Sequence, residues 1–289
     1  MDKTIRVALQ EFKMNFSKNE YRFFAFFLPG VLLVLAILMA FTGRQFSLFE
    51  FELMQKSYYF FAFPSMIAMV FSLAIFLSAN FILQGIAKEK ENKLLEILIS
   101  SVSFKQLLTG KILGLAMLGL IQFFAWVFAG LAAVALVAPE IFQKAFTSYI
   151  ATEAIFLYFI FFVLGYLLYA SLLAAIGVLT ETRSEAQQIG SLLTGFALIP
   201  ALSTMFITSD STSLYSQAIT VFPLTAPITA MIRIFLRTIT PGEIALSLAL
   251  LVITTVFIIF ATAKLFRAET LMYGKKFTIP GLIRFVFKG

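Results

Sequence analysis

Apolar runs of about 20 residues recur along the chain, which is the length a helix needs to cross a hydrocarbon core of roughly 30 Å. Of the 289 residues, 61% are hydrophobic and only 13% are charged. A water-soluble domain carries about twice that share of charged residues, so the composition excludes one. The sequence therefore predicts an all-α, polytopic membrane protein.

We expect six membrane-spanning helices, forming one transmembrane domain over residues 22–266. The predicted spans are 22–41, 58–86, 111–138, 153–179, 190–208 and 243–266. Residues 1–21 are expected to form an interfacial amphipathic helix, because Ile5, Leu9, Phe12 and Phe16 recur at helical spacing. Its basic lead-in is too long for a cleavable signal peptide, so we expect it to be retained. Residues 267–289 form a tail.

The stretch before the last span, Ser209–Gly242, is too polar at its start and too rich in proline to be an ordinary span. Its apolar centre, 228–239, predicts a short re-entrant or interfacial helix. A seventh crossing is the alternative, and it would place the C-terminus outside. Arg233 and Arg237 are expected to extend their charges to lipid headgroups, with guarding of an exit path as the alternative.

The positive charges predict the orientation. Seventeen of the 22 Lys and Arg residues lie in the N-terminal segment, the connections after the second and fourth spans, and the tail. By the positive-inside rule this face is cytoplasmic, and six spans place both termini there, as expected in a plasma (inner) membrane. The net charge of +7 lies beside apolar segments, so anionic lipids are the expected partner and nucleic acid is not.

The chain has neither cysteine nor histidine. It therefore lacks thiolates, the commonest general base and the commonest transition-metal ligand. A search for a phosphate-binding loop finds only Gly110-Lys111, without the upstream Gly or the following Ser or Thr. We expect no metal, cofactor or catalysis in this chain. If ATP drives it, another chain binds ATP and Mg²⁺.

The connection after the second span, 88–103, is the most informative segment. It opens with alternating charges and continues with Leu94, Ile97 and Leu98 on one helical face. Glu89 precedes Lys93 by four residues, which supports a helix. A short, charged amphipathic helix beneath a membrane is suited to docking a partner, and a helix merely solvated at the headgroups is the alternative.

Several short motifs follow one another in a fixed order. They are Glu89 and Glu91, Leu94-Leu95-Glu96, Ile97-Leu98, Ser101-Val102-Ser103, Gly110-Lys111, Arg183–Gln188, Phe222–Pro227 leading to Arg233, Leu265-Phe266-Arg267 and Leu271–Lys275. Over roughly residues 85–289 this order resembles the type-two ABC exporter permeases, in particular their sodium-efflux-like branch. Leu94 stands where Thr is usual, and Ser101 where Pro is usual. That branch usually carries a large extracytoplasmic domain after the first span, where this chain has only Thr42–Ser57.

The resemblance implies a two-fold assembly of this chain with itself or a related permease, each resting on an ATPase subunit that binds ATP and Mg²⁺. It implies that 88–103 is a coupling helix. The implied contacts with the ATPase subunit are Glu89, Glu91, Lys93 and Glu96, with Arg183, Glu185 and Gln187 as a secondary group. Transport would run out of the cytoplasm.

Polar residues within the spans have two interpretations. They are Ser72, Asn80, Gln84, Gln122, Thr194 and Ser203. Such groups form hydrogen bonds between helices or line a substrate path. Gly110 and Gly114 form a small-xxx-small pair that favours close helix packing. The substrate class stays open among ions, drugs, lipids and peptides.

Two other functional classes compete with a transporter. A membrane-embedded enzyme would place acids, His or Cys inside the bilayer, whereas the predicted spans hold only Glu153 and Glu243, both near an end. A non-transporting membrane scaffold is compatible with the composition, although it gives no account of the charged segment 88–103.

Overall fold

The computed structural model describes residues 2–41, 58–91, 102–137, 139, 143 and 152–271, and these ranges contain helices and no strand. The elements are α1 (Lys3–Phe16), α2 (Asn19–Arg22), the π-helical turn η1 (Phe23–Phe27), α3 (Leu28–Phe41), α5 (Tyr58–Glu91), α7 (Phe104–Val137), α9 (Thr152–Leu179), α10 (Arg183–Ser209), α11 (Leu214–Val221), α12 (Ala226–Phe235) and α13 (Pro241–Leu271). The predicted all-α fold is confirmed.

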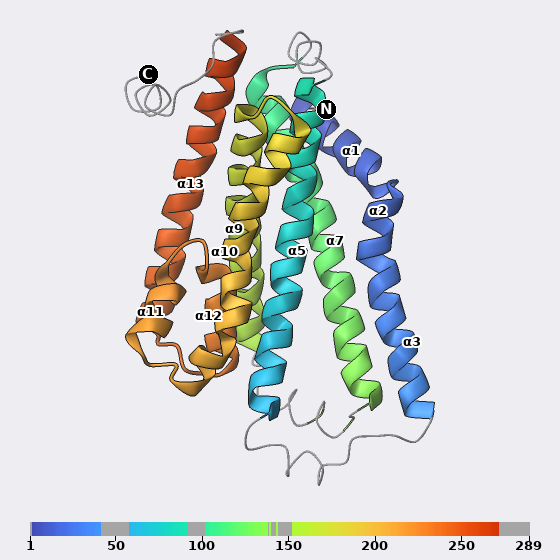
Figure 1. Ribbon diagram of the computed structural model, residues 1–289, viewed down its shortest axis with the longest axis vertical. Coiled ribbons are helices and arrows are strands. Elements are labelled where there is room, and N and C mark those ends of the chain that lie inside the picture. Colours follow the sequence, from blue (N-terminus) through green and yellow to red (C-terminus); the bar gives the residue numbers. More distant parts are fainter. Residues whose placement is uncertain are drawn as a thin grey trace.

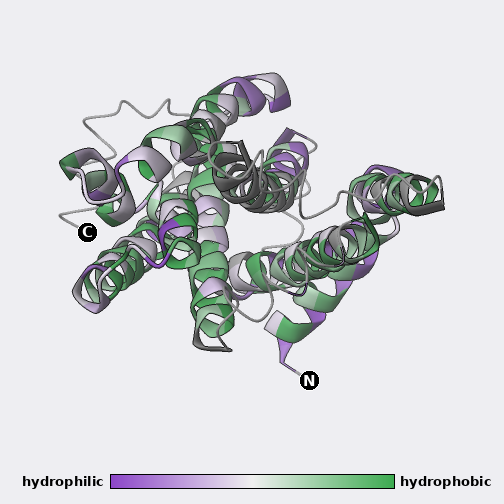
Figure 2. Ribbon diagram, turned by 90° about the horizontal axis from the view of Figure 1, so that it is seen from below, coloured by the Kyte–Doolittle hydropathy of each residue, from purple (hydrophilic) through white to green (hydrophobic). Residues whose placement is uncertain are grey.

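Five helical segments are long and apolar enough to cross a membrane. They are Asn19–Leu38, Thr109–Val137, Ala154–Leu179, Arg183–Ser209 and Pro241–Leu265. These five correspond to all the predicted spans except the second. That span lies within the 34-residue helix α5, whose crossing stays a prediction. Figure 2 shows hydrophobic residues around the outer sides of the long helices, where lipid replaces water as the solvent.

The long helices run side by side between two ends of the bundle (Figure 1). One end holds α1, the end of α5, and the starts of α7 and α10, and is called the basic end below. The other holds α11 and α12 and is called the hairpin end. The first and last described residues lie at the basic end, as a chain with an even number of crossings requires.

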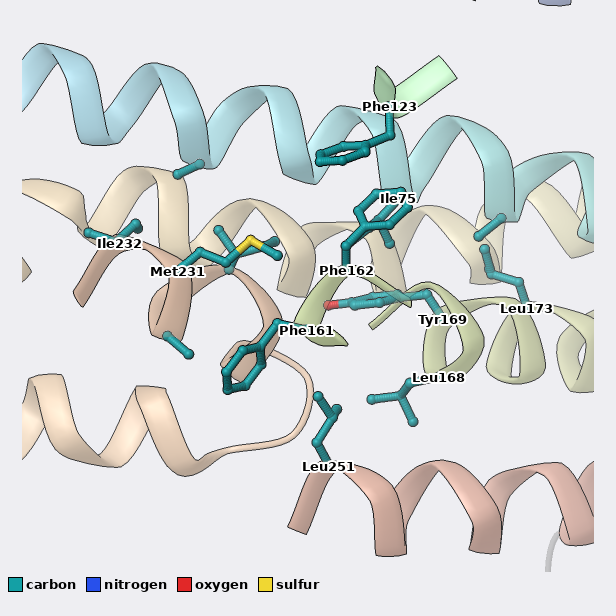
Figure 3. Packing of buried hydrophobic residues seen from close by; sticks show 14 of the residues in the cluster. Ile75, Phe123, Phe161, Phe162, Leu168, Tyr169, Leu173, Met231, Ile232 and Leu251 are labelled. Carbon is teal, nitrogen blue, oxygen red and sulfur yellow. The ribbon is translucent and has the colours of Figure 1, made fainter. Parts of the chain in front are cut away.

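Helix α9 lies at the centre and packs against α5, α12 and α13, while α3 packs on α7 at one edge. The core around α9 is built from large side chains of α9 itself and of α5, α7, α12 and α13, shown in Figure 3. Phe123 of α7 stacks on Phe162 of α9 with ring centroids 4.3 Å apart. In a membrane the hydrophobic effect does not drive helices together, because lipid tails are as apolar as the side chains. Close packing of side chains, as in this stack, stabilises the helix bundle instead.

The first span contains a break with an identifiable cause. Pro29 has no backbone N–H and its ring disfavours a regular helix before it, and the preceding turn widens into η1. In a π-helical turn the carbonyl of Phe24 would pair with the N–H five residues on, which is the one that Pro29 lacks. Trp126 of α7 donates its indole N–H to this carbonyl at 3.0 Å.

The region before the last helix is a hairpin of two short helices, α11 and α12. The ten residues of α12 extend about 15 Å, half of what a crossing needs, so α12 alone is too short for the alternative of a seventh crossing. A Cβ at Gly165 of α9 would lie only 2.5 Å from the Cβ of Pro227, so glycine is needed for α12 to approach. Tyr169 of α9 donates to the carbonyl of Leu224 at 2.7 Å.

Candidate functional site

Helix α1 packs across the start of α7 at the basic end, and two glycines permit the contact. A Cβ at Gly110 would lie 2.6 Å from the Cβ of Val7, and one at Gly114 would lie 2.3 Å from the carbonyl oxygen of Ala8. The pair Gly110 and Gly114 thus serves close helix packing, within a single chain.

Lys111, between these glycines in sequence, joins three helices through two carboxylates. Its ammonium donates to Glu11 Oε1 on α1 and, at 2.5 Å, to Glu89 Oε1 near the end of α5. The side chains of Lys111, Glu11 and Glu89 are only 4%, 9% and 16% exposed. This cluster of Glu11, Lys111 and Glu89 is called the carboxylate–lysine cluster below.

Further polar contacts extend the cluster along α1. Asn15 donates to Glu11 Oε2 at 3.1 Å, and Lys18 donates to Asn15 Oδ1 at 2.5 Å. Burial lowers the pKa of Lys18 from its ordinary value, against the opposing attraction of Glu11. The inward-pointing polar face of α1 is therefore packed against α7 and linked to α5 through Lys111.

Glu89 is electrostatically the least compensated member of the cluster. Burial raises the pKa of its carboxyl above its ordinary range, although Lys111 acts in the opposite direction. Its second oxygen, Oε2, is buried without a hydrogen-bond partner. Loss of hydration at this carboxylate therefore outweighs the attraction of Lys111.

Two further contacts hold the last turns of α5. Lys90 donates to the carbonyl of Val178 at the end of α9, at 2.6 Å. Arg183, at the start of α10, donates to Gln84 Oε1 at 3.0 Å. Helix α5 thus extends to Glu91, which lies within the predicted coupling segment 88–103, and is fastened to α1, α7, α9 and α10.

The predicted ATPase contacts fall into three groups. Glu91, Arg183, Glu185 and Gln187 are exposed at the basic end. Glu89 belongs to the buried cluster instead. Lys93, Glu96 and most of 88–103 lie outside the described residues. The contact with an ATPase subunit stays a prediction for all of them.

Sequence reasoning missed two members of this site, Glu11 and Asn15. The available signal was that Glu11 is the one acidic residue within α1, where the other charged residues are basic. In the sequence its partner Lys111 stands out only as part of the Gly110-Lys111 motif. Nothing local in the sequence pairs residues 100 positions apart.

The predicted path residues lie in several environments. Ser72, Gln122 and Ser203 are buried within the chain. Ser72 donates to the carbonyl of Ala68 on its own helix, and Asn80 to that of Phe76. Bonds between helices are made by Ser203, whose hydroxyl lies 2.6 Å from that of Tyr215, and by Gln84. Thr194 lies in α10. A role in a substrate path stays a prediction.

The expectation that Arg233 extends to lipid headgroups is wrong. Its side chain is 1% exposed and donates to both oxygens of Glu243, at 3.0 and 3.2 Å. It also donates to Thr220 Oγ1 at 3.3 Å and to the carbonyl of Thr238 at 3.1 Å. Arg233 therefore fastens the hairpin to the start of α13, and Arg237 alone of the two arginines is exposed.

Among the residues that the structure describes, no group of three acidic, His or Cys side chains is placed to hold a metal ion. In the carboxylate–lysine cluster the cation is Lys111, and in the Arg233–Glu243 pair it is Arg233.

Comparison with known proteins identifies the class. Residues 45–264 match the family described as ABC-2 family transporter protein. The chain belongs to this family, and is thus a multi-pass membrane permease of the ABC transporter class.

Two relatives extend the match. The uncharacterized protein MJ1024 of Methanocaldococcus jannaschii is 30% identical over 216 residues, which cover 75% of this chain and 51% of that protein. The uncharacterized protein YhaP of Bacillus subtilis is 25% identical over 211 residues, covering 71% of this chain and 50% of that protein. The chain spans about half the length of these relatives.

Proposed function

We propose that this chain is the membrane-spanning subunit of an ATP-binding-cassette exporter, which moves a substrate out of the cytoplasm using ATP hydrolysed by a separate subunit. The observation that carries the proposal is the fastening of the last turns of α5, which include the first residues of the charged segment 88–103. A partner that displaces this segment would move α5 together with the helices bonded to it.

The coupling would follow from these contacts. ATP and Mg²⁺ bind in the partner, two ATPase subunits close, and their movement enters through 88–103. Glu91, Lys93 and Glu96 then make the direct contact, with Arg183, Glu185 and Gln187 beside them. Charged groups at such an interface fix register and partner choice. A second permease chain, identical or related, completes the pathway between the two subunits.

The distribution of charges supports the proposed orientation of the chain. Seventeen of the 22 basic residues fall on the connections and ends assigned to one side, which favours a cytoplasmic basic end in the plasma (inner) membrane. The ordered motifs favour the sodium-efflux-like branch of the family. The predicted path holds hydroxyls and amides without carboxylates, which would suit Na⁺ poorly, so the substrate class stays open.

The test is affinity purification in mild detergent, with mass spectrometry of co-purifying proteins and an ATPase assay. We expect a partner with a phosphate-binding loop at one copy per permease. The triple charge reversal Glu91→Lys, Lys93→Glu, Glu96→Lys should abolish its retention. The matched control is Asp210→Lys, which reverses an exposed acid at the hairpin end and should leave retention intact.

Two outcomes would contradict the proposal. A chain that purifies alone under every gentle condition would favour the alternative functions, a stand-alone membrane enzyme or a scaffold. Equal retention by the triple reversal and the unaltered chain would remove 88–103 as the contact.

A further inference from the structure

The surface at the start of α7 is covered by α1. Gly110 and Gly114 leave space for the backbone of α1, and Lys111 lies between them with its ammonium held by Glu11 and Glu89. Space and charge therefore coincide on the same two turns. The sequence Gly110-Lys111-Ile112-Leu113-Gly114 functions as a seat for α1.

Helix α1 is divided into three faces that match this seat. Val7, Ala8, Glu11 and Asn15 point toward the protein. Ile5, Leu9 and Phe16 are exposed although apolar, and Arg6 and Lys13 are exposed beside them. An apolar face flanked by basic residues is what an interfacial helix presents to lipid and headgroups. Helix α1 therefore has one face for α7 and the others for the membrane surface.

The carboxylate–lysine cluster is poorly explained as a source of stability. Buried ion pairs lose hydration, and replacing them by apolar groups is often neutral or stabilising. Here Glu89 leaves one buried oxygen without a partner. What the cluster does provide is a fixed geometry between α1, α5 and α7, and no short connection joins α1 to the other two.

We propose that Lys111 is a positioning residue that makes α1, the end of α5 and the start of α7 one mechanical unit, so that α1 moves with the ATPase-facing segment. This inference rests on the proposed function. Residues 92–103 leave one member of the unit and return to another, so a force on them acts on the whole unit. The apolar face of α1 then carries that movement along the membrane surface.

The first test cuts the cluster without leaving a buried charge. In the triple variant Glu11→Gln, Lys111→Met, Glu89→Gln all three charges are removed and the side-chain volumes are nearly kept. We expect the ATPase subunit to co-purify and the melting temperature to hold. The ATPase rate of the complex in nanodiscs should fall to that of the isolated ATPase subunit. The single variant Lys111→Arg, which keeps the charge and both carboxylates, should retain coupling.

The second test replaces the cluster by a covalent bond. The chain has no cysteine, so cysteines at Val7 and Gly110 stand alone, and the Cβ positions of this pair meet at 2.6 Å. A Cβ at Gly110 would also lie 2.8 Å from the carbonyl oxygen of Thr4, so the α1 backbone must move outward for the two Cβ atoms to reach the roughly 3.8 Å of a disulfide. Oxidation in the triple variant should restore coupling, and reduction should remove it again. A merely structural cluster would show no dependence on the disulfide.

A third test acts on shape alone and has a matched control. Gly114→Val drives a side chain into the backbone of α1, whereas a Cβ at Gly130, on the same helix, meets nothing within 4 Å. Gly114→Val should lose coupling while retaining the ATPase subunit, and Gly130→Val should behave as the unaltered chain.

The outcomes separate the two proposals. If no ATPase subunit co-purifies with the unaltered chain, the proposed function fails. If the subunit co-purifies and the triple variant still stimulates it normally, the function stands and the positioning role of Lys111 is overturned. Equal coupling by Gly114→Val and Gly130→Val would likewise overturn it.

Discussion

Two buried ion-pair clusters lie at opposite ends of the bundle, and they differ in how far apart in sequence their members are. Arg233 and Glu243 are ten residues apart. At the basic end, Lys111 pairs with residues 22 and 100 positions away. The first cluster closes a local hairpin. The second joins α1 to α5 and α7, from which it is far removed in sequence.

The carboxylates also differ in how well they are satisfied. Glu243 accepts from Arg233 at both oxygens and from the backbone N–H and hydroxyl of Thr240. Glu89 accepts at one oxygen only. A saturated local pair is suited to static structure, whereas an unsaturated distant one is suited to elements whose relative position matters for function.

The largest expected effect comes from removing the cation at the basic end. Lys111→Met leaves two buried carboxylates without a counter-charge, and we expect a loss of about 3–5 kcal/mol in the free energy of unfolding. Thermal unfolding in detergent measures it. Adding Glu11→Gln and Glu89→Gln should recover most of the loss. No recovery would mean that packing by Lys111, not charge, holds the site.

Removing the cation at the hairpin end should have a smaller effect. In Arg233→Met, Glu243 keeps its bonds to Thr240 and is part-exposed, so we expect a loss of about 2–3 kcal/mol, on the scale of hydrogen bonds to charged groups. The same unfolding assay applies. The control Arg237→Met changes an exposed arginine four residues on and should alter stability little. If Arg233→Met and Arg237→Met lost equal stability, Arg233 would not fasten the hairpin.

A steric change should weaken the hairpin without touching its charges. Gly165→Val places atoms where Pro227 packs, and we expect a loss of about 1–2 kcal/mol from overpacking. Gly195→Val in α10 is the control, since a Cβ there meets nothing within 4 Å. Coupling to the ATPase should survive Gly165→Val if the hairpin is static. A selective loss of coupling would contradict the contrast drawn between the two ends.

The smallest effect concerns pH at the basic end. Because burial raises the pKa of Glu89, the folded chain holds this proton more tightly than the unfolded chain does. This contribution to stability is present below the ordinary glutamate pKa of 4.5 and is lost as pH rises through the raised value. Lys111, Glu11 and Lys18 act on the same carboxyl.

The check is melting temperature against pH from 4.5 upward. The unaltered chain should show a declining component that Glu89→Gln removes. Glu20→Gln, at an exposed position on α2, should leave the profile unchanged. A profile that keeps its slope in Glu89→Gln would assign the titration to another group.

Hydropathy located the helices well, since apolar length is a local property. The predicted span 153–179 corresponds to α9 (Thr152–Leu179) almost residue for residue. The predicted span 190–208 begins seven residues after the start of the helix that contains it, because α10 starts at Arg183. Thr182 caps the first turn by accepting from the N–H of Glu185 at 3.2 Å. Hydropathy reports where lipid surrounds a helix, while capping decides where the helix begins.

The site was harder to predict because its geometry comes from tertiary contacts. The small-xxx-small pair Gly110 and Gly114 indicated close packing, yet the partner helix could not be named from spacing. Glu11 appeared as one polar residue of an amphipathic helix. The apolar neighbours of Arg233 in the sequence predict a place at the headgroups, whereas in the fold Arg233 forms an ion pair with Glu243, ten residues later. Charge partners in a bilayer are set by which helices meet.

The break at η1 supplies the molecule with a built-in spectroscopic reporter. Trp126 is the only tryptophan in the chain, and its indole N–H is engaged by the carbonyl that Pro29 leaves without a helical partner. Tryptophan emission therefore originates at one place, the seam between the first span and α7. Because indole emission responds to hydrogen bonding and local polarity, its wavelength would report whether that seam stays closed during a turnover, with no label added.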